Sequence, residues 1–245
     1  MTGETIVITR PQGDEHLLAG LLHDHGYRII HEPLTHIFLY HTQRQALHRA
    51  LIGEPDAVIV TSRHAVQAMA LLTDMRDAYL ICVGDATARA AYSLGFDRIS
   101  ISGGNAQSLI DTVLAGYDRG SRFLYLSGQH VQAEIDAILA EKGMHAEKLT
   151  LYEATAATHL SDTLLEQLRR GHIDGVTFLS QRTATIFMQL LYKADSLPSL
   201  VHARAFCLSA AIAATLRSPP WKSIHAAGEA TLASLLECVD NTLQR

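Results

Sequence analysis

Strand-length apolar segments alternate with amphipathic helical stretches along this sequence, and no other feature restricts the fold as strongly. The helical patterns include DEHLLAGLLHDHG, RHAVQAMALLTDM, QAEIDAILAEKG and TLLEQLRRG, and several end at glycine, as helices often do. The expected strands are residues 5–10, 27–33, 56–62, 79–84, 98–103, 122–128, 148–154, 173–180, 204–209 and 223–228. Nearly continuous apolar strands separated by helices are typical of parallel sheets that are covered on both faces, so we expect an α/β protein.

The sequence also contains an internal repeat. DAVIVTSRHAV begins at Asp56 and DGVTFLSQRTA begins at Asp174, and each joins an apolar run to a hydroxyl-rich corner with an arginine. RPQGDEHLLAGLLHDHGYRIIHEPLT is similar to SGQHVQAEIDAILAEKGMHAEKLTLYEA, and YLICVGDATARAA is similar to RAFCLSAAIAATL. We name the units, in chain order, A (the RPQGD segment with the strand before it), B (the DAVIV segment) and C (the YLICV segment), and their counterparts A′, B′ and C′. The order of units is therefore A-B-C followed by A′-B′-C′. This pattern predicts two similar flavodoxin-like domains of about 120 residues each.

Two extended segments complicate a simple division into consecutive domains. HEPLTHIFLYHT (31–42) is too long for a connection, and KLTLYEATAATH (148–159) occupies the equivalent place in the second copy. These segments could pair as a two-stranded ladder. The chain would then begin one domain with unit A, complete the other with B-C-A′, and return for B′-C′. From the pattern alone, the consecutive and crossed arrangements both stay open.

The composition excludes several classes of protein. The net charge is −5 and basic residues do not cluster, which argues against nucleic acid as a partner. No segment has the length of a membrane span or the layout of a secretion signal. The 3 cysteines lack metal-ligand spacing and the 14 histidines are scattered, so we expect core thiols in a reducing cytoplasm and no metal site.

The predicted strand ends carry small, hydroxyl-rich and glycine-rich corners. In a parallel sheet the ligand lies beyond the carboxyl ends of the strands, where helix N-termini present free N–H groups. Arg10, Arg63 and Arg182 add positive charge at three corners. Any single corner is more simply explained as a helix cap than as a ligand-binding site. Their number in two opposed domains, however, predicts a cleft that binds a ligand with many negative groups.

The common catalytic motifs are missing from the sequence. It has no GxGxxG, GxxxxGK[ST] or GxSxG pattern. Asp85 and Glu229 lie at strand ends and could be general acids, but they are more simply explained as carboxylates in the cap or first turn of a helix, where the helix dipole stabilises them. Two classes therefore stay open, a two-lobed binding or sensor protein and an enzyme whose substrate brings its own reactivity.

Over nearly its whole length the chain resembles the uroporphyrinogen-III synthase family. The segments that carry this resemblance, in order, are VITRPQGD, PLTHI, DAVIVTSRHAV, VGDATARAAYSLGF, GGNAQSL, LYLSG, LYEA, IDGVTFLSQRTA and AAGEATLASLL. The resemblance implies two α/β lobes joined by a two-stranded ladder, which is the crossed arrangement. The expected boundaries are 1–35 with 160–245 for one domain, 41–152 for the other, and 36–40 with 153–159 for the linker strands.

The resemblance also implies an activity. Enzymes of this family cyclise the linear tetrapyrrole hydroxymethylbilane with inversion of ring D and loss of water, giving uroporphyrinogen III without a cofactor or metal. An azafulvene cation forms, and attack by the substituted carbon of ring D gives a spiro intermediate. The substrate carries eight carboxylates, which backbone N–H groups and a few arginines can bind. Further expectations are a monomer and substrate hand-over from hydroxymethylbilane synthase.

The site residues follow from matching positions. The resemblance implies that Tyr152, in LYEA, assists loss of the substrate hydroxyl, whereas the simpler interpretation is a packed ladder residue with a solvated hydroxyl. The expected substrate-binding residues are Arg10, Thr61, Ser62, Arg63, Thr87, Ser127, Gly128, Ser180, Arg182 and Thr183. Arg10 and Arg182 are included because they lie in strand-end corners, and the others match family positions.

Three positions depart from the family pattern. His64 and Gln181 replace the usual Asn and Pro, and the turn at Ser209 lacks the usual Gly and Thr. The alternative function is therefore a non-catalytic, two-lobed paralogue that binds a tetrapyrrole or another polyanion.

Overall fold

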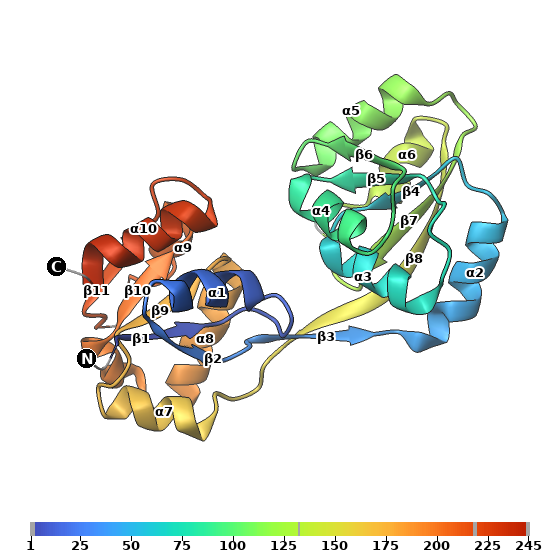
Figure 1. The fold of residues 1–245 in the computed structure, drawn as a ribbon. Coiled ribbons are helices and arrows are strands. Elements are labelled where there is room, and N and C mark those ends of the chain that lie inside the picture. Colours follow the sequence, from blue (N-terminus) through green and yellow to red (C-terminus); the bar gives the residue numbers. More distant parts are fainter. Residues whose placement is uncertain (1–2, 132, 218–219, 244–245) are drawn as a thin grey trace. The chain divides into compact units, whose positions relative to one another are not determined.

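A computed structural model describes residues 3–131, 133–217 and 220–243. The chain divides into two compact units (Figure 1). Unit 1 comprises Met1–His36 and Thr155–Arg245, and unit 2 comprises Ile37–Ala154. Each unit has its own predominantly parallel sheet with helices packed against it, which confirms the predicted α/β class.

Unit 1 contains a 5-stranded parallel sheet in the order β11-β10-β9-β1-β2. Its strands are β1 (Thr5–Ile8), β2 (Arg28–His31), β9 (Gly175–Phe178), β10 (Arg204–Cys207) and β11 (Ser223–Ala226). Its helices are α1 (His16–Asp24), α7 (Asp162–Arg169), α8 (Gln181–Lys193), α9 (Ala210–Ala214), α10 (Leu232–Leu243) and the 3₁₀ helix η2 (Leu197–His202).

Unit 2 contains a 6-stranded sheet in the order β3-β8-β7-β4-β5-β6. Its strands are β3 (Thr35–Leu39), β4 (Ala57–Val60), β5 (Leu80–Val83), β6 (Ile99–Ser102), β7 (Arg122–Gly128) and β8 (His145–Ala156). Its helices are α2 (Arg44–Ile52), α3 (Arg63–Leu72), α4 (Asp85–Ser93), α5 (Ala106–Gly116), α6 (Ile135–Glu141) and the 3₁₀ helix η1 (His41–Gln43).

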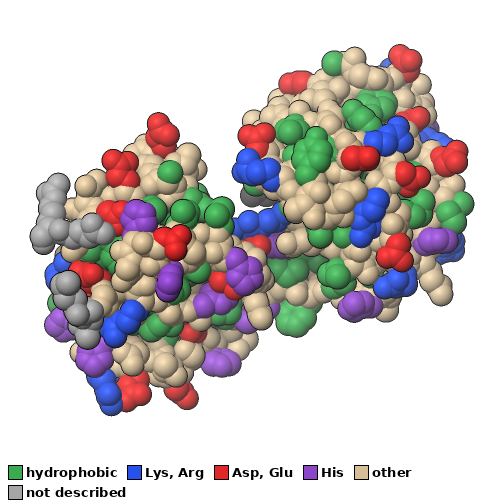
Figure 2. Space-filling view, in the orientation of Figure 1, with side chains coloured by type: hydrophobic (Ala, Val, Ile, Leu, Met, Phe, Trp, Pro, Cys, Tyr) green, Lys and Arg blue, Asp and Glu red, His purple; other side chains and the backbone are tan. Residues whose placement is uncertain are grey.

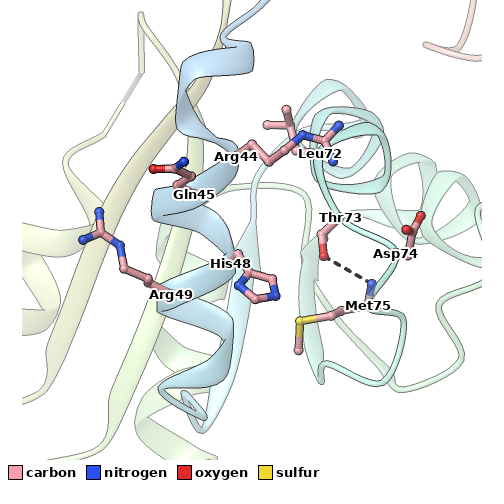
Figure 3. Close-up of a pocket in the computed structure, with 8 residues that line it drawn as sticks. All are labelled: Arg44, Gln45, His48, Arg49, Leu72, Thr73, Asp74 and Met75. Carbon is pink, nitrogen blue, oxygen red and sulfur yellow. Dashed lines mark hydrogen bonds between the residues drawn. The ribbon is translucent and has the colours of Figure 1, made fainter.

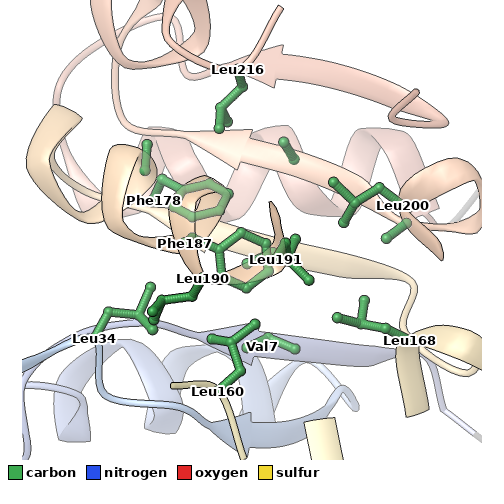
Figure 4. Packing of buried hydrophobic residues seen from close by; sticks show 14 of the residues in the cluster. Val7, Leu34, Leu160, Leu168, Phe178, Phe187, Leu190, Leu191, Leu200 and Leu216 are labelled. Atoms are coloured by element: carbon green, nitrogen blue, oxygen red, sulfur yellow. The ribbon is translucent and has the colours of Figure 1, made fainter. Parts of the chain in front are cut away.

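The sheet of unit 1 is buried on both faces, as its continuous apolar strands predict. Val7 of β1 packs into one hydrophobic core with Phe178 and Phe187 (Figure 4). Its neighbours Ile6 and Ile8 point to the opposite face and pack into a second core. Side chains alternate between the faces of a strand, so a strand between two helical layers needs apolar residues at every position.

The strand order decides between the consecutive and crossed arrangements. β1, from repeat unit A, pairs with β9 from B′, while β7, from A′, pairs with β4 from B. Each sheet is therefore built from pieces of both repeats, as the resemblance implied. In unit 2 the chain enters at β4 rather than at β7, so its strands follow one another in circularly permuted order. When this permutation is taken into account, both units have the flavodoxin-like strand order 2-1-3-4-5.

The two connecting strands, β3 and β8, pair with each other. The Tyr40 N–H donates to the Leu151 carbonyl at 2.8 Å, and the Ala157 N–H donates to the Leu34 carbonyl at 3.0 Å. Because residue numbers rise on one strand as they fall on the other, the strands are antiparallel. The predicted two-stranded ladder is thus present, as an edge extension of the unit 2 sheet.

Surface and helix composition add two observations. On the faces in view, acidic and basic side chains are interspersed over both units (Figure 2). Within the described ranges, no helix has the length and apolar character needed to cross a membrane.

Candidate functional site

Unit 2 contains a pocket of about 290 Å³ at the carboxyl ends of β4 and β7. It is lined by Thr61, Ser62, Val83, Gly104, Asn105, Ala106, Tyr125, Gly128, His130, Val131, Ala133, Ile135 and Tyr152. The carboxyl ends of parallel strands meet at one edge of a sheet, which is where ligands bind in this architecture. Four predicted site residues, Thr61, Ser62, Gly128 and Tyr152, lie together there.

Tyr152 is held at this pocket by a hydroxyl pair. Its phenolic oxygen lies 2.8 Å from the Ser62 Oγ, and only 9% of the residue is exposed. Ser62 is the N-cap of α3, and its Oγ accepts a hydrogen bond from the Ala65 N–H at 3.1 Å. The ring of His64 lies 5.7 Å from the Tyr152 ring, at an interplanar angle of 59°. The helix cap thus fixes the position of the phenol.

A β-bulge orients Tyr152. Ser127 of β7 pairs with Thr150, but Gly128 pairs with Tyr152, so Leu151 is an extra residue on β8. A Cβ atom on residue 128 would lie only 2.7 Å from the Tyr152 Cζ, closer than such atoms can approach. Glycine is therefore required at position 128 for the tyrosine ring to lie over β7.

Burial controls the ionisation of Tyr152. It raises the pKa of the phenol, and the hydrogen bond with Ser62 opposes this effect only in part. The phenol is therefore neutral near pH 7, where it can donate a hydrogen bond or a proton. This is the state that protonation of a departing hydroxyl requires.

The other predicted residues of unit 2 lie around this pocket but do not all line it. Arg63 is the first residue of α3. Thr87, in the first turn of α4, is 5% exposed and Ser127 is 1% exposed, and neither lines the pocket. The Ser127 Oγ has no hydrogen-bond partner among the described residues. Both residues are therefore buried rather than exposed at the pocket.

In unit 1, the predicted residues follow the adjacent strands β1 and β9. The Arg10 guanidinium lies 3.7 Å from the Asp14 carboxylate. Ser180 caps α8 by accepting from the Thr183 N–H at 3.1 Å, and the two hydroxyl oxygens are 2.6 Å apart. Arg182 is exposed in the first turn of α8. Because β1 and β9 are parallel neighbours, these residues share one sheet edge.

Two of the departures from the family pattern meet in unit 1. The Gln181 side chain donates to the Ala211 carbonyl at 3.1 Å, which links α8 to α9. Ser209 is the N-cap of α9, but its side chain makes no capping hydrogen bond. Gln181 thus acts as an interhelix contact.

A larger pocket of about 780 Å³ lies elsewhere in unit 2, between α2 and the segment that follows α3 (Figure 3). Arg44 and His48 line one side, and Thr73 and Met75 line the other. The Thr73 Oγ1 accepts from the Met75 N–H at 3.3 Å, so this polar group has a local partner. The pocket contains no predicted site residue, and the strand-end position favours the smaller pocket as the site.

Among the pocket residues that sequence reasoning missed, three have polar side chains: Tyr125, Asn105 and His130. In the apolar strand segment FLYL, Tyr125 is the only residue whose side chain carries a polar group. This could have identified it as a candidate site residue. Asn105 lies in GGNAQS, where it forms a capping box with Ser108 and begins α5. Within the described ranges no group of His, Cys, Asp and Glu residues could hold a metal ion.

Comparisons with known proteins identify a family and a fold. The family model described as uroporphyrinogen-III synthase HemD matches residues 17–237. A search of curated proteins found no match.

Two solved structures share the fold. The uroporphyrinogen-III synthetase of Helicobacter pylori 26695 is 18% identical, with 98% of this chain and 99% of that chain covered and a TM-score of 0.61. A mutant uroporphyrinogen III synthase from the extremely thermophilic bacterium Thermus thermophilus is 17% identical, with 99% of each chain covered and a TM-score of 0.58.

Proposed function

Because this chain belongs to the uroporphyrinogen-III synthase family, we propose that it converts hydroxymethylbilane to uroporphyrinogen III with inversion of ring D and loss of water. The family match over residues 17–237 carries this proposal. The position of a neutral tyrosine in a strand-end pocket supports it.

The binding chemistry of the strand ends suits a polycarboxylate. The Ser62 and Ser180 corners begin α3 and α8, and the first N–H groups of a helix attract anions. Arg63 and Arg182 add guanidinium groups in the same first turns. We propose that the predicted residues of each unit bind substrate carboxylates in this way, Thr87 and Ser127 acting through the backbone because their side chains are buried.

Tyr152 is the proposed catalytic residue. Its phenol donates a proton or hydrogen bond to the hydroxyl that leaves from ring A, and the resulting azafulvene cation is attacked by the substituted carbon of ring D. The pyrroles supply the electrons for every bond that forms. The protein's main contribution is thus to hold the linear substrate so that the substituted carbon of ring D reaches ring A first. Attack by the unsubstituted α-carbon of ring D would instead give the unrearranged isomer I.

The experiment supplies hydroxymethylbilane, generated in situ by hydroxymethylbilane synthase, and resolves the product isomers after oxidation. Spontaneous closure without the protein gives isomer I and serves as the baseline. Formation of isomer III is expected. Isomer I alone would overturn the proposal and favour the non-catalytic paralogue, to which the departures at His64, Gln181 and Ser209 point.

We also propose a setting for this reaction. Cys82, Cys207 and Cys238 are free thiols, and two are buried, as is usual in a reducing cytoplasm. The protein is proposed to act as a monomer that receives its unstable substrate from hydroxymethylbilane synthase. A sedimentation experiment with both proteins tests the monomer and the hand-over complex together.

A further inference from the structure

Tyr125 is a second phenol in the Tyr152 pocket. It lies on β7, two residues before Ser127, and is only 1% exposed. The mouth of the pocket is formed by exposed residues such as Asn105 and His130, whereas Tyr125 and Ile135 are almost fully buried. Tyr125 therefore lies at the enclosed end.

Two consecutive hydroxyl residues at the end of β4 accompany the two phenols. Ser62 binds the Tyr152 hydroxyl, and Thr61 interacts with the Tyr125 hydroxyl. Burial is the main reason why the pKa of Tyr125 is raised, so this phenol is also neutral and can donate. Lys148, which lies nearby, is ion-paired with Glu134.

The size of the pocket limits what can enter it. Pockets for drug-sized ligands occupy roughly 300–1,000 Å³, and this one, at about 290 Å³, is at the lower limit. It accommodates one substituted pyrrole ring rather than a whole tetrapyrrole. Its lining includes no lysine or arginine among the described residues, so a carboxylate that enters must be bound by hydroxyl, amide, imidazole or backbone N–H donors.

Building on the proposed function, we propose that Tyr125 is a further substrate-contacting residue, whose phenolic O–H donates a hydrogen bond to a carboxylate on one pyrrole ring. This carboxylate takes no part in bond making or breaking. The hydrogen bond is consequently the same in the ground state and the transition state, and it contributes to binding but not to turnover.

The test is steady-state kinetics of Tyr125→Phe with hydroxymethylbilane, with isomer III as the measured product. A lost hydrogen bond to a charged group raises KM about ten-fold, and kcat stays within about two-fold. Tyr117→Phe is the matched control, because burial also raises the pKa of Tyr117 but the residue does not line the pocket. It should leave KM unchanged.

A second variant covers the case in which Tyr125→Phe does not fold. Ala133→Leu adds bulk to the pocket lining from a half-buried position, and it should also raise KM. Unchanged KM in Tyr125→Phe, or in Ala133→Leu if only that variant folds, overturns this inference alone. A wild-type protein that makes no isomer III overturns the proposed function and this inference with it.

Discussion

At the scale of single residues, the sequence located the strand-end corners but not the direction of each side chain. Thr61 and Ser62 both line the pocket, whereas Thr87 and Ser127, which were predicted on the same grounds, are buried away from it. A hydroxyl at a corner can either cap a helix, contact a ligand or pack inward. Which of these occurs depends on the rotation of the strand end, and a local motif does not contain that information.

Tyr152→Phe should lower kcat by about 10- to 100-fold without abolishing the formation of isomer III. This effect is at or below the low end of what a proton donor contributes, because we expect positioning of the substrate to supply most of the rate. Single-turnover assays measure the change. Tyr79→Phe is the control, since Tyr79 immediately precedes β5, at the opposite edge of the same sheet. A kcat equal to wild type would remove Tyr152 from the mechanism.

His225 should make unfolding depend on pH. Burial lowers the pKa of His225 in the folded protein, with a smaller contribution from the charge of Arg204. Below about pH 6.5 the unfolded chain therefore binds more protons at this residue than the folded protein does. The stability that neutral, buried His225 contributes is lost as the pH falls below this value.

The measurement compares urea unfolding of wild type and His225→Gln at pH 7.5, 6.5 and 5.5. The wild type should lose more stability than the variant, by at most about 1.4 kcal/mol per pH unit. The other histidines are present in both proteins, so the difference isolates His225. Identical slopes would show that this residue does not couple folding to protonation.

At the scale of elements, the apolar pattern predicted the strands well, but it did not predict their register. β8 extends over His145–Ala156, beyond the predicted segment 148–154 at both ends, because its first residues pair with β7 and its second half pairs with β3. The bulge opposite Ser127 and Gly128 is also invisible in the sequence. A bulge arises from the fit between two strands, and apolar periodicity describes only one strand at a time.

Gly128→Ala should disrupt the site through this bulge. The new methyl group would overlap the Tyr152 ring, so we expect a loss of about 1–3 kcal/mol in the free energy of unfolding. Turnover should fall at least as far as in Tyr152→Phe, because the phenol leaves Ser62.

Gly116→Ala is the matched control for this substitution. Gly116 is the last residue of α5. Apart from its chain neighbours and the backbone of its own helix, an added Cβ would meet no atom of the described residues within 4 Å. Alanine there should stabilise the protein by about 0.5–1 kcal/mol and leave turnover unchanged. Thermal unfolding and kcat measured on both variants distinguish the site effect from a general glycine effect.

At the scale of the whole molecule, the sequence left the crossed and consecutive arrangements open for a physical reason. The two repeats have the same order of strands and helices. Exchanging unit A for A′ therefore leaves every strand with an equivalent neighbouring strand in its sheet. Only the pairing of β1 with β9 and of β7 with β4 distinguishes the two. The resemblance to a family supplied what the pattern lacked.

Unit 2 should fold by itself. It is one continuous segment with two hydrophobic cores of its own, and residues 34–157 retain both ends of the β3–β8 ladder. This fragment should give a dispersed amide NMR spectrum and a cooperative urea transition. Residues 1–36 alone should be unfolded, because β1 lacks β9. A disordered 34–157 fragment would contradict the independence of the units.

The pairing of β1 with β9 has a further consequence during protein synthesis. The Thr9 hydroxyl donates to the Thr177 carbonyl at 2.7 Å, so a central contact of unit 1 joins residues 168 positions apart. The amino-terminal segment, with β1 and its first partner β2, therefore leaves the ribosome long before the second partner strand β9 exists, and unit 2 is completed first. Until translation passes β9, the side of the apolar strand β1 that pairs with β9 lacks its partner, and we expect chaperones to bind the nascent chain there.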